Sequence, residues 1–453
     1  MLSDKFRRQL RQEAEQWRTE GIIDDSVYEQ LCDRYQFNDL EASARSRFIV
    51  ILLGLGSVLL GLAIITFVAA NWQAWSRGLK VTLLLSGFIG VNTAGFYLWR
   101  HPTERWQRRF GQGLLLLGAL ILGANMALMS QMFHQSGLLY QLYLVWGFGV
   151  LTMAYSLRLT MLGILAILLI ALGYVQGQPE FVAIGEFPWL RFVVQYMPVL
   201  AALMFIPLAY WCRSRWIFRL GAIATIYFLE ANLIRLNLLG SPPWTAAVAC
   251  ALPPALLWGY RDSLWGQRSP KAQSFDSTAR SLAITFLSLL FFLASFYGLW
   301  STSLVPSAND TSLTLPPPVD ILLLAGWTVW EWVQLLRRVD LTNLLVASMI
   351  TVSALIPFWH LSSGRLAIIA TLIFNLLSFL LSTGLIREGL AQSQRRFFWG
   401  GMVLLTLQIL SRMLEYNTDL LFKSLVLFLC GLGVIAAGLW FERYRTRHSQ
   451  VDG

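Results

Sequence analysis

Charged residues are scarce in this sequence. Asp, Glu, Lys and Arg make up 13% of its 453 residues, about half of their share in an average soluble domain. Hydrophobic residues, in contrast, make up 56%. A chain of this composition has too little polar surface to cover its apolar residues in water. The composition therefore excludes an ordinary soluble protein and predicts a membrane protein.

Cysteine and histidine are also scarce, with four residues of each type. The cysteines form no CxxC pair, and the histidines have no spacing that would hold a metal ion. No Walker lysine motif, HExxH or GxSxG occurs in the chain, which removes the common signatures of membrane-bound hydrolases and nucleotide-driven pumps. We therefore expect no catalytic residue, no metal and no cofactor, and predict that the protein is not an enzyme.

Long apolar runs dominate what remains. Runs of about 17 to 25 residues, the length that crosses a bilayer, recur from residue 48 almost to the end. We predict an all-α polytopic transmembrane helix bundle with fourteen spans, at 48–70, 79–99, 110–130, 138–156, 159–175, 194–211, 216–236, 243–260, 280–301, 319–336, 341–360, 364–386, 396–413 and 420–441. Twelve is the alternative count, because 159–175 is short and Pro253-Pro254 interrupts 243–260.

Lys and Arg residues alternate between rich and poor connecting segments. If the amino terminus is cytoplasmic, the predicted inner segments hold 28 of the 35 Lys and Arg residues and the outer ones hold 7. Positive residues favour the cytoplasmic side, so we predict a multi-pass membrane protein with both termini in the cytoplasm. Most of the positive residues behind the net charge of +10 thus lie in the predicted inner segments. The expected partner is a lipid bilayer, and no nucleic acid.

The segment before the first span predicts a cytoplasmic helical hairpin. Apolar residues recur at helical spacing in its first half, at Phe6, Leu10, Ala14 and Trp17. Gly21 ends this helix, and Ser26 with Glu29 forms a capping-box pattern that opens a second. One interpretation is a basic segment that retains the amino terminus inside. The alternative is that residues 1–40 dock a cytosolic or membrane protein, the lipid surface or another copy of the chain.

Three stretches carry a resemblance to a known family. They are EGIIDDSVYEQL in the hairpin, FVAANW from Phe67 to Trp72, and GANMALMSQMFHQSGLLYQLYLVWGFGVLTMAYSLR from Gly123 to Arg158. Over about residues 10–175 the chain resembles the uncharacterised bacterial membrane family called domain of unknown function 2157. The resemblance implies a short cytoplasmic helical start followed by many spans, and it implies no settled activity.

The predicted organisation has four parts. Residues 1–47 form the hairpin, 48–175 the family-like transmembrane region, 176–441 a C-terminal transmembrane bundle and 442–453 a basic cytoplasmic tail. The resemblance covers the first two parts only. The two later parts are predicted from hydropathy and charge alone.

Polar residues within the apolar runs are the candidates for function. An ionised side chain at the centre of a membrane helix costs about 2.5 to 3.5 kcal/mol, so each needs a partner, water or a role. In the predicted topology several fall in the outer halves of their spans or in outer turns. We hypothesise that they line one outward-facing polar vestibule: Asn71, Asn125, Gln131, His134, Glu230, Arg412 and Glu415. The alternative is that they are solvated near loops or join helices to one another.

Glu331 is a second deep carboxylate, in the span 319–336. The predicted topology puts it about four residues from the cytoplasmic interface. Snorkelling, or pairing with Arg337 or Arg338, is therefore the favoured explanation over a buried role.

Two functional classes follow from these features. Many spans with internal prolines and a few deep polar groups favour a transporter or a flippase-like protein. The small number of deep charges favours the alternative, a structural, assembly or accessory protein that recruits a partner through its N-terminal hairpin. Neither the substrate nor the oligomeric state follows from the sequence.

Overall fold

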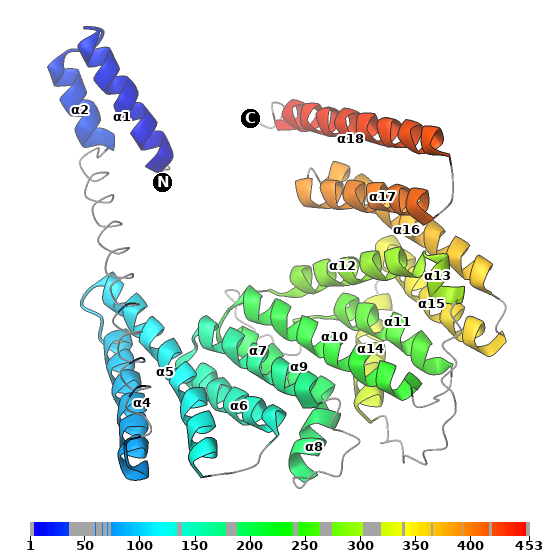
Figure 1. Cartoon of the computed structure of the whole chain (residues 1–453). Helices are drawn as coiled ribbons and strands as arrows, with labels where there is room; N and C mark the ends of the chain where they lie inside the picture. Colours follow the sequence, from blue (N-terminus) through cyan, green and yellow to red (C-terminus); the bar gives the residue numbers. More distant parts are fainter. Residues whose placement is uncertain are drawn as a thin grey trace. The chain divides into compact units, whose positions relative to one another are not determined.

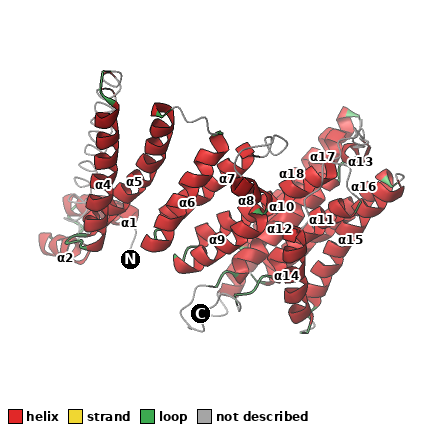
Figure 2. Cartoon of the chain, turned by 90° about the horizontal axis from the view of Figure 1, so that it is seen from below, coloured by secondary structure: helices red, strands yellow, loops and turns green. Residues whose placement is uncertain are grey.

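The structure is a computed structural model of the chain (Figure 1). It describes residues 4–35, 59, 66, 70, 74–133, 138–177, 188–238, 243–262, 274–301, 319–337, 340–363, 366–392, 394–415 and 419–449. Within these residues every regular element is a helix, as Figure 2 shows.

The helices occupy most of the described chain. Their bounds are α1 (Asp4–Thr19), α2 (Asp25–Tyr35), α4 (Arg77–Arg100), α5 (Arg105–Met132), α6 (Leu139–Leu157), α7 (Thr160–Gly177), α8 (Pro188–Gln195), α9 (Met197–Trp211), α10 (Arg215–Leu238), α11 (Trp244–Gly259), α12 (Asp276–Ala294), α13 (Tyr297–Ser301), α14 (Val319–Leu336), α15 (Leu341–Ser363), α16 (Ala367–Ala391), α17 (Arg395–Glu415) and α18 (Leu420–Ser449).

These helices confirm the all-α polytopic fold class. Each predicted span from 79–99 onward overlaps a helix, although 280–301 is divided between α12 and α13, whereas most of the predicted span 48–70 lies outside the described residues. Nine helices of the described part are long and apolar enough to cross a membrane. Two shorter apolar helices, Met197–Trp211 and Trp244–Gly259, add to them. The choice between fourteen and twelve crossings stays a prediction.

Residues 1–87 form one compact unit and residues 88–453 another. In the first, α1 and α2 make the predicted hairpin around Ala14, which is completely buried. Gly21 turns the chain with a positive φ of 73°, a conformation that glycine adopts without strain. Helix α2 begins at Asp25, one residue before the predicted cap Ser26, and the Asp24 carboxylate accepts a hydrogen bond from the Asp25 N–H at 2.9 Å.

The second unit is a layered set of packed helices. Sequential helices pair along the chain, α6 with α7, α9 with α10 and α16 with α17, while α11 packs against α12, α14 and α15 (Figure 1). One hydrophobic core extends from α5 to α10 and contains both Tyr174 and Met197, which are fully buried. This core continues across the predicted boundary at 175/176. A second core joins α10, α11, α12, α14, α15, α16 and α17.

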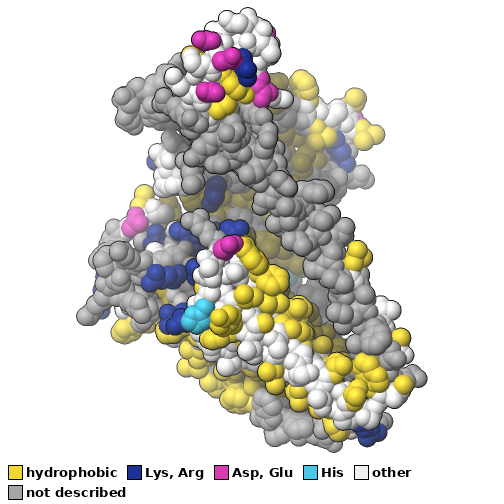
Figure 3. Space-filling view, turned by 90° about the vertical axis from the view of Figure 1, so that its left-hand side faces the viewer, with side chains coloured by type: hydrophobic (Ala, Val, Ile, Leu, Met, Phe, Trp, Pro, Cys, Tyr) yellow, Lys and Arg dark blue, Asp and Glu magenta, His cyan; other side chains and the backbone are white. Residues whose placement is uncertain are grey.

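The outer surfaces of these helices are apolar. No residue in the apolar stretch of α18 is buried, and only 6% of those in the apolar stretch of α4 are. Figure 3 shows a broad hydrophobic area with Lys and Arg side chains gathered at its edge. In water such a surface would drive aggregation. In a bilayer it meets lipid tails of the same polarity. The protein therefore sits in a lipid bilayer.

Candidate functional site

The first residues of the predicted vestibule are placed only in part. Asn71 and His134 lie outside the described residues. Asn125 is buried on α5, with 5% of its surface exposed. Gln131 lies in the last turn of the same helix and is exposed. Helix α5 ends at Met132 and α6 starts at Leu139, as expected for the interruption after Gln131; that the turn faces outward stays a prediction.

Glu230 lies on α10 and is partly buried. Its Oε1 atom has no hydrogen-bond partner among the described residues. Cys250, on the neighbouring helix α11, is close enough to interact with it electrostatically. Glu230 makes no hydrogen bond or ion pair with Arg412 or Glu415 in the described part of the chain.

Arg412 and Glu415, at the end of α17, form an ion pair. The Arg412 guanidinium donates hydrogen bonds to the carbonyl oxygen of Ser295 at 2.8 Å and to its hydroxyl at 3.3 Å. The Glu415 carboxylate accepts a hydrogen bond from the backbone N–H of Tyr297 at 2.6 Å. The ion pair thus provides hydrogen-bond partners for backbone groups between α12 and α13, where the helical hydrogen bonds are interrupted.

A chain of amides continues this contact toward the bundle interior. The Gln408 side chain donates to Asn375 and accepts from the Ser378 hydroxyl at 3.1 Å. Asn375 in turn donates to the Ser295 carbonyl oxygen at 3.1 Å. These hydrogen bonds connect α16 and α17 to the C-terminal end of α12. The predicted vestibule as one site stays a hypothesis, because the structure joins Arg412 to Glu415 but does not join either to Glu230.

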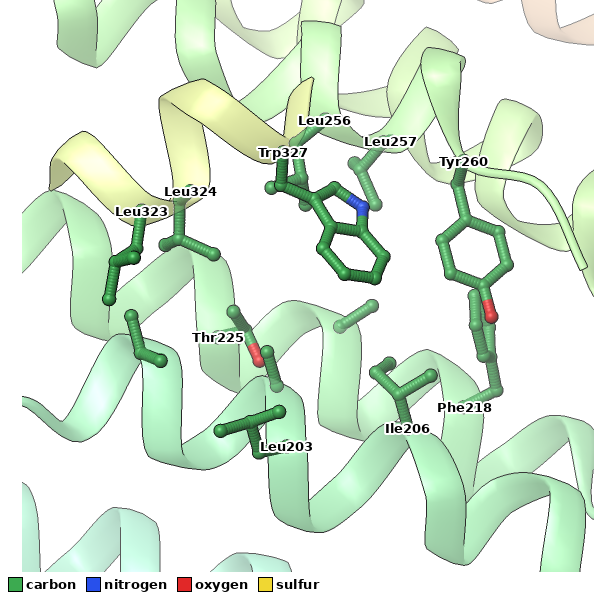
Figure 4. A pocket seen from close by; sticks show the side chains of 13 residues that line it. Leu203, Ile206, Phe218, Thr225, Leu256, Leu257, Tyr260, Leu323, Leu324 and Trp327 are labelled. Atoms are coloured by element: carbon green, nitrogen blue, oxygen red, sulfur yellow. The ribbon is translucent and has the colours of Figure 1, made fainter. Parts of the chain in front are cut away.

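A different feature, a cavity of about 310 Å³, lies between α9, α10, α11 and α14. Figure 4 shows α14 residues facing α9 and α10 residues across this space, with the Tyr260 and Phe218 rings at one end. Its lining is almost entirely apolar: Val199, Ala202, Leu203, Ile206, Phe218, Ala222, Thr225, Leu256, Leu257, Tyr260, Leu323, Leu324 and Trp327. The Thr225 hydroxyl donates within its own helix, to the Gly221 carbonyl at 2.9 Å.

Polar groups gather beyond one end of this cavity, around Asn232. Its amide donates to Asp320 Oδ2 at 3.0 Å and to the Gln195 carbonyl at 3.0 Å. The Tyr174 hydroxyl donates to Asn232 Oδ1 at 2.8 Å. Asp320 is 5% exposed and lies in the first turn of α14, where the helix dipole favours a negative charge. We call Tyr174, Asn232 and Asp320 the Asn232 cluster.

A second polar cluster lies beyond the other end of the cavity. The hydroxyls of Tyr260, which lines the cavity, and Tyr210 are 2.7 Å apart. Tyr210 donates to the Asp262 carboxylate, which also accepts from the Phe275 N–H at 3.0 Å. The Asp262 N–H donates to Asp276 Oδ1 at 3.0 Å. We call Tyr210, Tyr260, Asp262 and Asp276 the tyrosine cluster.

The buried position of Glu331 contradicts the expectation that its side chain snorkels to the cytoplasmic interface. Its side chain is 2% exposed, and its Oε2 atom has no hydrogen-bond partner among the described residues. Arg337 is exposed, and Arg338 lies outside the described part of the chain. Glu331 is buried because α14 turns the face that carries it toward α11. Hydropathy could not reveal this, since it reports depth along a helix and not which face is packed.

A helical-spacing signal in the sequence could have indicated these groups. Asp320, Leu324, Thr328 and Glu331 follow at i, i+4, i+8 and i+11, which is one face of a helix. Eleven residues at 1.5 Å each put the two carboxylates about 16 Å apart along α14. The partner of Asp320, Asn232 on α10, could not be found in this way because it lies 88 residues away in the chain.

The structure shows no group of His, Cys, Asp and Glu that could hold a metal ion within its described residues. The cysteines Cys32, Cys212, Cys250 and Cys430 are free. Burial raises the pKa of the Cys212 thiol to about 11, which keeps it in the unreactive thiol form. The expectations of no cofactor and no enzymatic activity stay predictions.

Comparison with known proteins addresses the N-terminal part of the chain. Residues 15–163 match the family described as "Predicted membrane protein (DUF2157)". This stretch of the chain belongs to the DUF2157 family. It contains the second helix of the hairpin, α4, α5 and α6. The cavity and its two polar clusters lie entirely beyond the DUF2157 region.

The chain is also similar to short curated relatives. Probable 4-amino-4-deoxy-L-arabinose-phosphoundecaprenol flippase subunit ArnE of Salmonella enteritidis is 29% identical over 101 residues, 22% of this chain and 87% of the relative. The subunit of the same name from Escherichia fergusonii is 30% identical over 100 residues, 22% of this chain and 88% of the relative. No solved structure matches the chain.

Proposed function

We propose that the protein is a flippase-like transporter that moves an amphiphile with a hydrocarbon chain between the two leaflets of the membrane. One observation carries the proposal. An apolar cavity of about 310 Å³ within the helix bundle has a cluster of polar groups beyond each end. An amphiphile has this same division into an apolar chain and a polar head.

The cavity is open to lipid on its side. Leu203 on α9 and Leu323 on α14 both line it, and they are 54% and 57% exposed. Lipid tails are about as apolar as leucine, so a hydrocarbon chain neither gains nor loses much free energy when it enters. The head group is the costly part, because polar groups are unfavourable in hydrocarbon. The Asn232 cluster and the tyrosine cluster provide polar partners for it at the two ends.

Similarity supports the same class of function. The curated relatives are named as flippase subunits for 4-amino-4-deoxy-L-arabinose-phosphoundecaprenol, an amphiphile. The similarity covers 22% of this chain, so the substrate of the relatives is a guide to class only. Internal prolines at 207, 253, 254 and 357 add local bends of the kind that transporters use.

The test is a flipping assay on purified protein in liposomes. The probes are nitrobenzoxadiazole-labelled analogues of a phospholipid and of a polyprenyl phosphate, and dithionite bleaches whichever label faces outward. Ala202→Phe fills the cavity, and Ala436→Phe on the exposed face of α18 adds the same ring elsewhere. The added ring occupies space that the hydrocarbon chain of the probe would need, and overpacking by itself costs about 1–3 kcal/mol of folding stability, so the accumulation of both variants is compared as well.

We expect acceleration of at least one probe by the wild type and by Ala436→Phe, and its loss in Ala202→Phe. A wild-type protein that accelerates neither probe contradicts the proposal. Equal rates for both variants show that the cavity is not on the route.

A second candidate function, recruitment of a partner by the hairpin, has one observation in its favour. Ile22 and Val27 are apolar and exposed, at 65% and 42%, although the hairpin has a core of its own. Deletion of residues 1–35 separates the two functions. A flippase-like bundle retains flipping without them, whereas an assembly protein loses its cellular role while the bundle still accumulates.

We further infer that the protein resides in the bacterial inner membrane with both termini in the cytoplasm. The orientation rests on the 28 to 7 distribution of Lys and Arg, and the inner membrane on the similarity to bacterial ArnE subunits. In this topology the Asn232 cluster lies toward the outer leaflet and the tyrosine cluster toward the inner one.

A further inference from the structure

Glu331 is the most isolated buried carboxyl group of the described bundle. It is 2% exposed, and one of its oxygens has no hydrogen-bond partner. Burying an ionised carboxylate without a partner is costly, and such a group instead takes up a proton. Intramembrane carboxyl groups of this kind commonly mark proton pathways. The question is whether a route exists for the proton.

The position of Glu331 connects it to the cavity. It follows the cavity residue Trp327 by one helical turn on α14. Gly259, at the end of α11, makes room for this part of α14: a Cβ at position 259 would lie 3.2 Å from the Trp332 ring and 3.5 Å from the Glu331 Cβ. The next residue, Tyr260, lines the cavity and interacts electrostatically with Glu331. An occupant of the cavity therefore lies beside Tyr260 and Trp327, one helical turn of α14 from Glu331.

The surroundings of Glu331 include one compensating cation. From the segment after α11, Arg261 interacts favourably with the carboxylate form. From the start of α12, Asp276 opposes that form, while Arg280 partly compensates Asp276. On the side of α15, the nearby polar residue is Asn343, which is neutral and is bound by the Trp258 indole at 3.0 Å.

A line of exchangeable protons begins at Tyr260, the residue that follows Gly259. Tyr260 and Tyr210 share a hydrogen bond of 2.7 Å, Tyr210 donates to Asp262, and the Asp262 N–H contacts Asp276. These groups lead from the cavity to the segment between α11 and α12, which the predicted topology puts on the cytoplasmic side. Chains of hydroxyl and carboxyl groups conduct protons by successive hydrogen-bond exchange.

We propose that Glu331 is a proton-binding site of the transport cycle and that its proton exchanges with the cytoplasm through the tyrosine cluster. The O–H bond of the Glu331 carboxyl group breaks, the proton passes along the hydroxyls to water, and Arg261 compensates the carboxylate that remains. The proton is then the coupling ion for what occupies the cavity. This inference rests on the proposed function, but the proton site itself can be measured without it.

The first measurement is infrared difference spectroscopy of the full-length protein in liposomes during a pH titration. It follows the carbonyl band of protonated carboxyl groups. Glu331→Gln is compared with Glu388→Gln, which alters an exposed glutamate on α16. We expect a titrating band in the wild type and in Glu388→Gln, and loss of that band in Glu331→Gln. An unchanged band in Glu331→Gln overturns the proposal.

The second measurement concerns the route. Tyr260→Phe removes one hydroxyl and keeps the ring that lines the cavity. We expect the Glu331 band to persist in this variant and its hydrogen–deuterium exchange to become several-fold slower. Exchange at the wild-type rate rules out the tyrosine route.

The third measurement concerns coupling and uses the flipping assay with a pH gradient. We expect the gradient to accelerate flipping by the wild type and to have no effect on Glu331→Gln. Stimulation that persists in Glu331→Gln overturns the coupling. If no probe is flipped but the infrared band behaves as expected, the proposed function fails while the proton site stands.

Discussion

Arg412 provides a sharp test of whether residues that the sequence assigns to a vestibule instead hold helices together. Its guanidinium binds Ser295 through two hydrogen bonds and pairs with Glu415. The two charged side chains are only 16% and 17% exposed. Arg412→Met keeps most of the side-chain length and removes all of these interactions. We expect it to lower the free energy of unfolding.

The expected cost can be worked out from these contacts. Interhelical hydrogen bonds in membrane proteins contribute about 0.6 kcal/mol each on average, so the two bonds to Ser295 contribute about 1 kcal/mol. A charge left unpaired in a protein interior costs about 3–5 kcal/mol, and the partial exposure of Glu415 reduces this to about 2 kcal/mol. Arg412→Met should therefore cost about 3 kcal/mol in total.

Adding Glu415→Gln to Arg412→Met should restore most of this loss. The glutamine carries no charge, and its oxygen still accepts the hydrogen bond from the Tyr297 N–H. The double variant should then cost only about 1 kcal/mol, about 2 kcal/mol less than Arg412→Met alone, so the two sites are coupled by at least that amount. The matched control is Arg387→Met, which alters an exposed arginine on α16.

The measurement is the unfolding of the purified protein in mixed micelles by increasing dodecyl sulfate, followed by tryptophan fluorescence. The free energies of the wild type, both single variants, the double variant and the control complete the cycle. If Arg412→Met stays within about 0.5 kcal/mol of the wild type but abolishes transport, the structural role is refuted and the vestibule hypothesis gains support.

Three further outcomes follow from the structure. Gly123→Ala should destabilise the fold by about 1–3 kcal/mol, because the new Cβ would overlap the Trp146 ring; Trp146→Leu should relieve this in a dye-monitored melting experiment. Ala14→Glu should open the hairpin by charging its completely buried centre, seen as faster proteolysis after Arg18. A cysteine at Ser76 should react with an impermeant maleimide on intact cells, and one at Thr103 should not; the reverse pattern contradicts the predicted topology.

Much of the fold could be predicted from the sequence, because what determines a membrane helix is local. An apolar run of sufficient length has to satisfy its own backbone hydrogen bonds in hydrocarbon, and a helix does so without help from other segments. The runs from 79–99 to 420–441 therefore coincide with helices. The hairpin followed from spacing for the same reason, with Ala14 at its centre.

The positions of the polar contacts could not be predicted in this way. Arg412 binds Ser295 across 117 residues, and Asn232 binds Asp320 across 88. Such partners depend on which helices are neighbours and which faces they share. Glu331 shows the consequence: its sequence position suggested an interface, but the packing of α14 against α11 buries it.

The sequence by itself determined that this is a helical membrane protein, where its helices lie along the chain and that its N-terminal part forms a hairpin, because hydropathy and periodicity act within each segment. Only the tertiary structure decided which polar groups meet, which carboxyl group is isolated and where a cavity remains, because these depend on distances between segments that the chain brings together only when it packs.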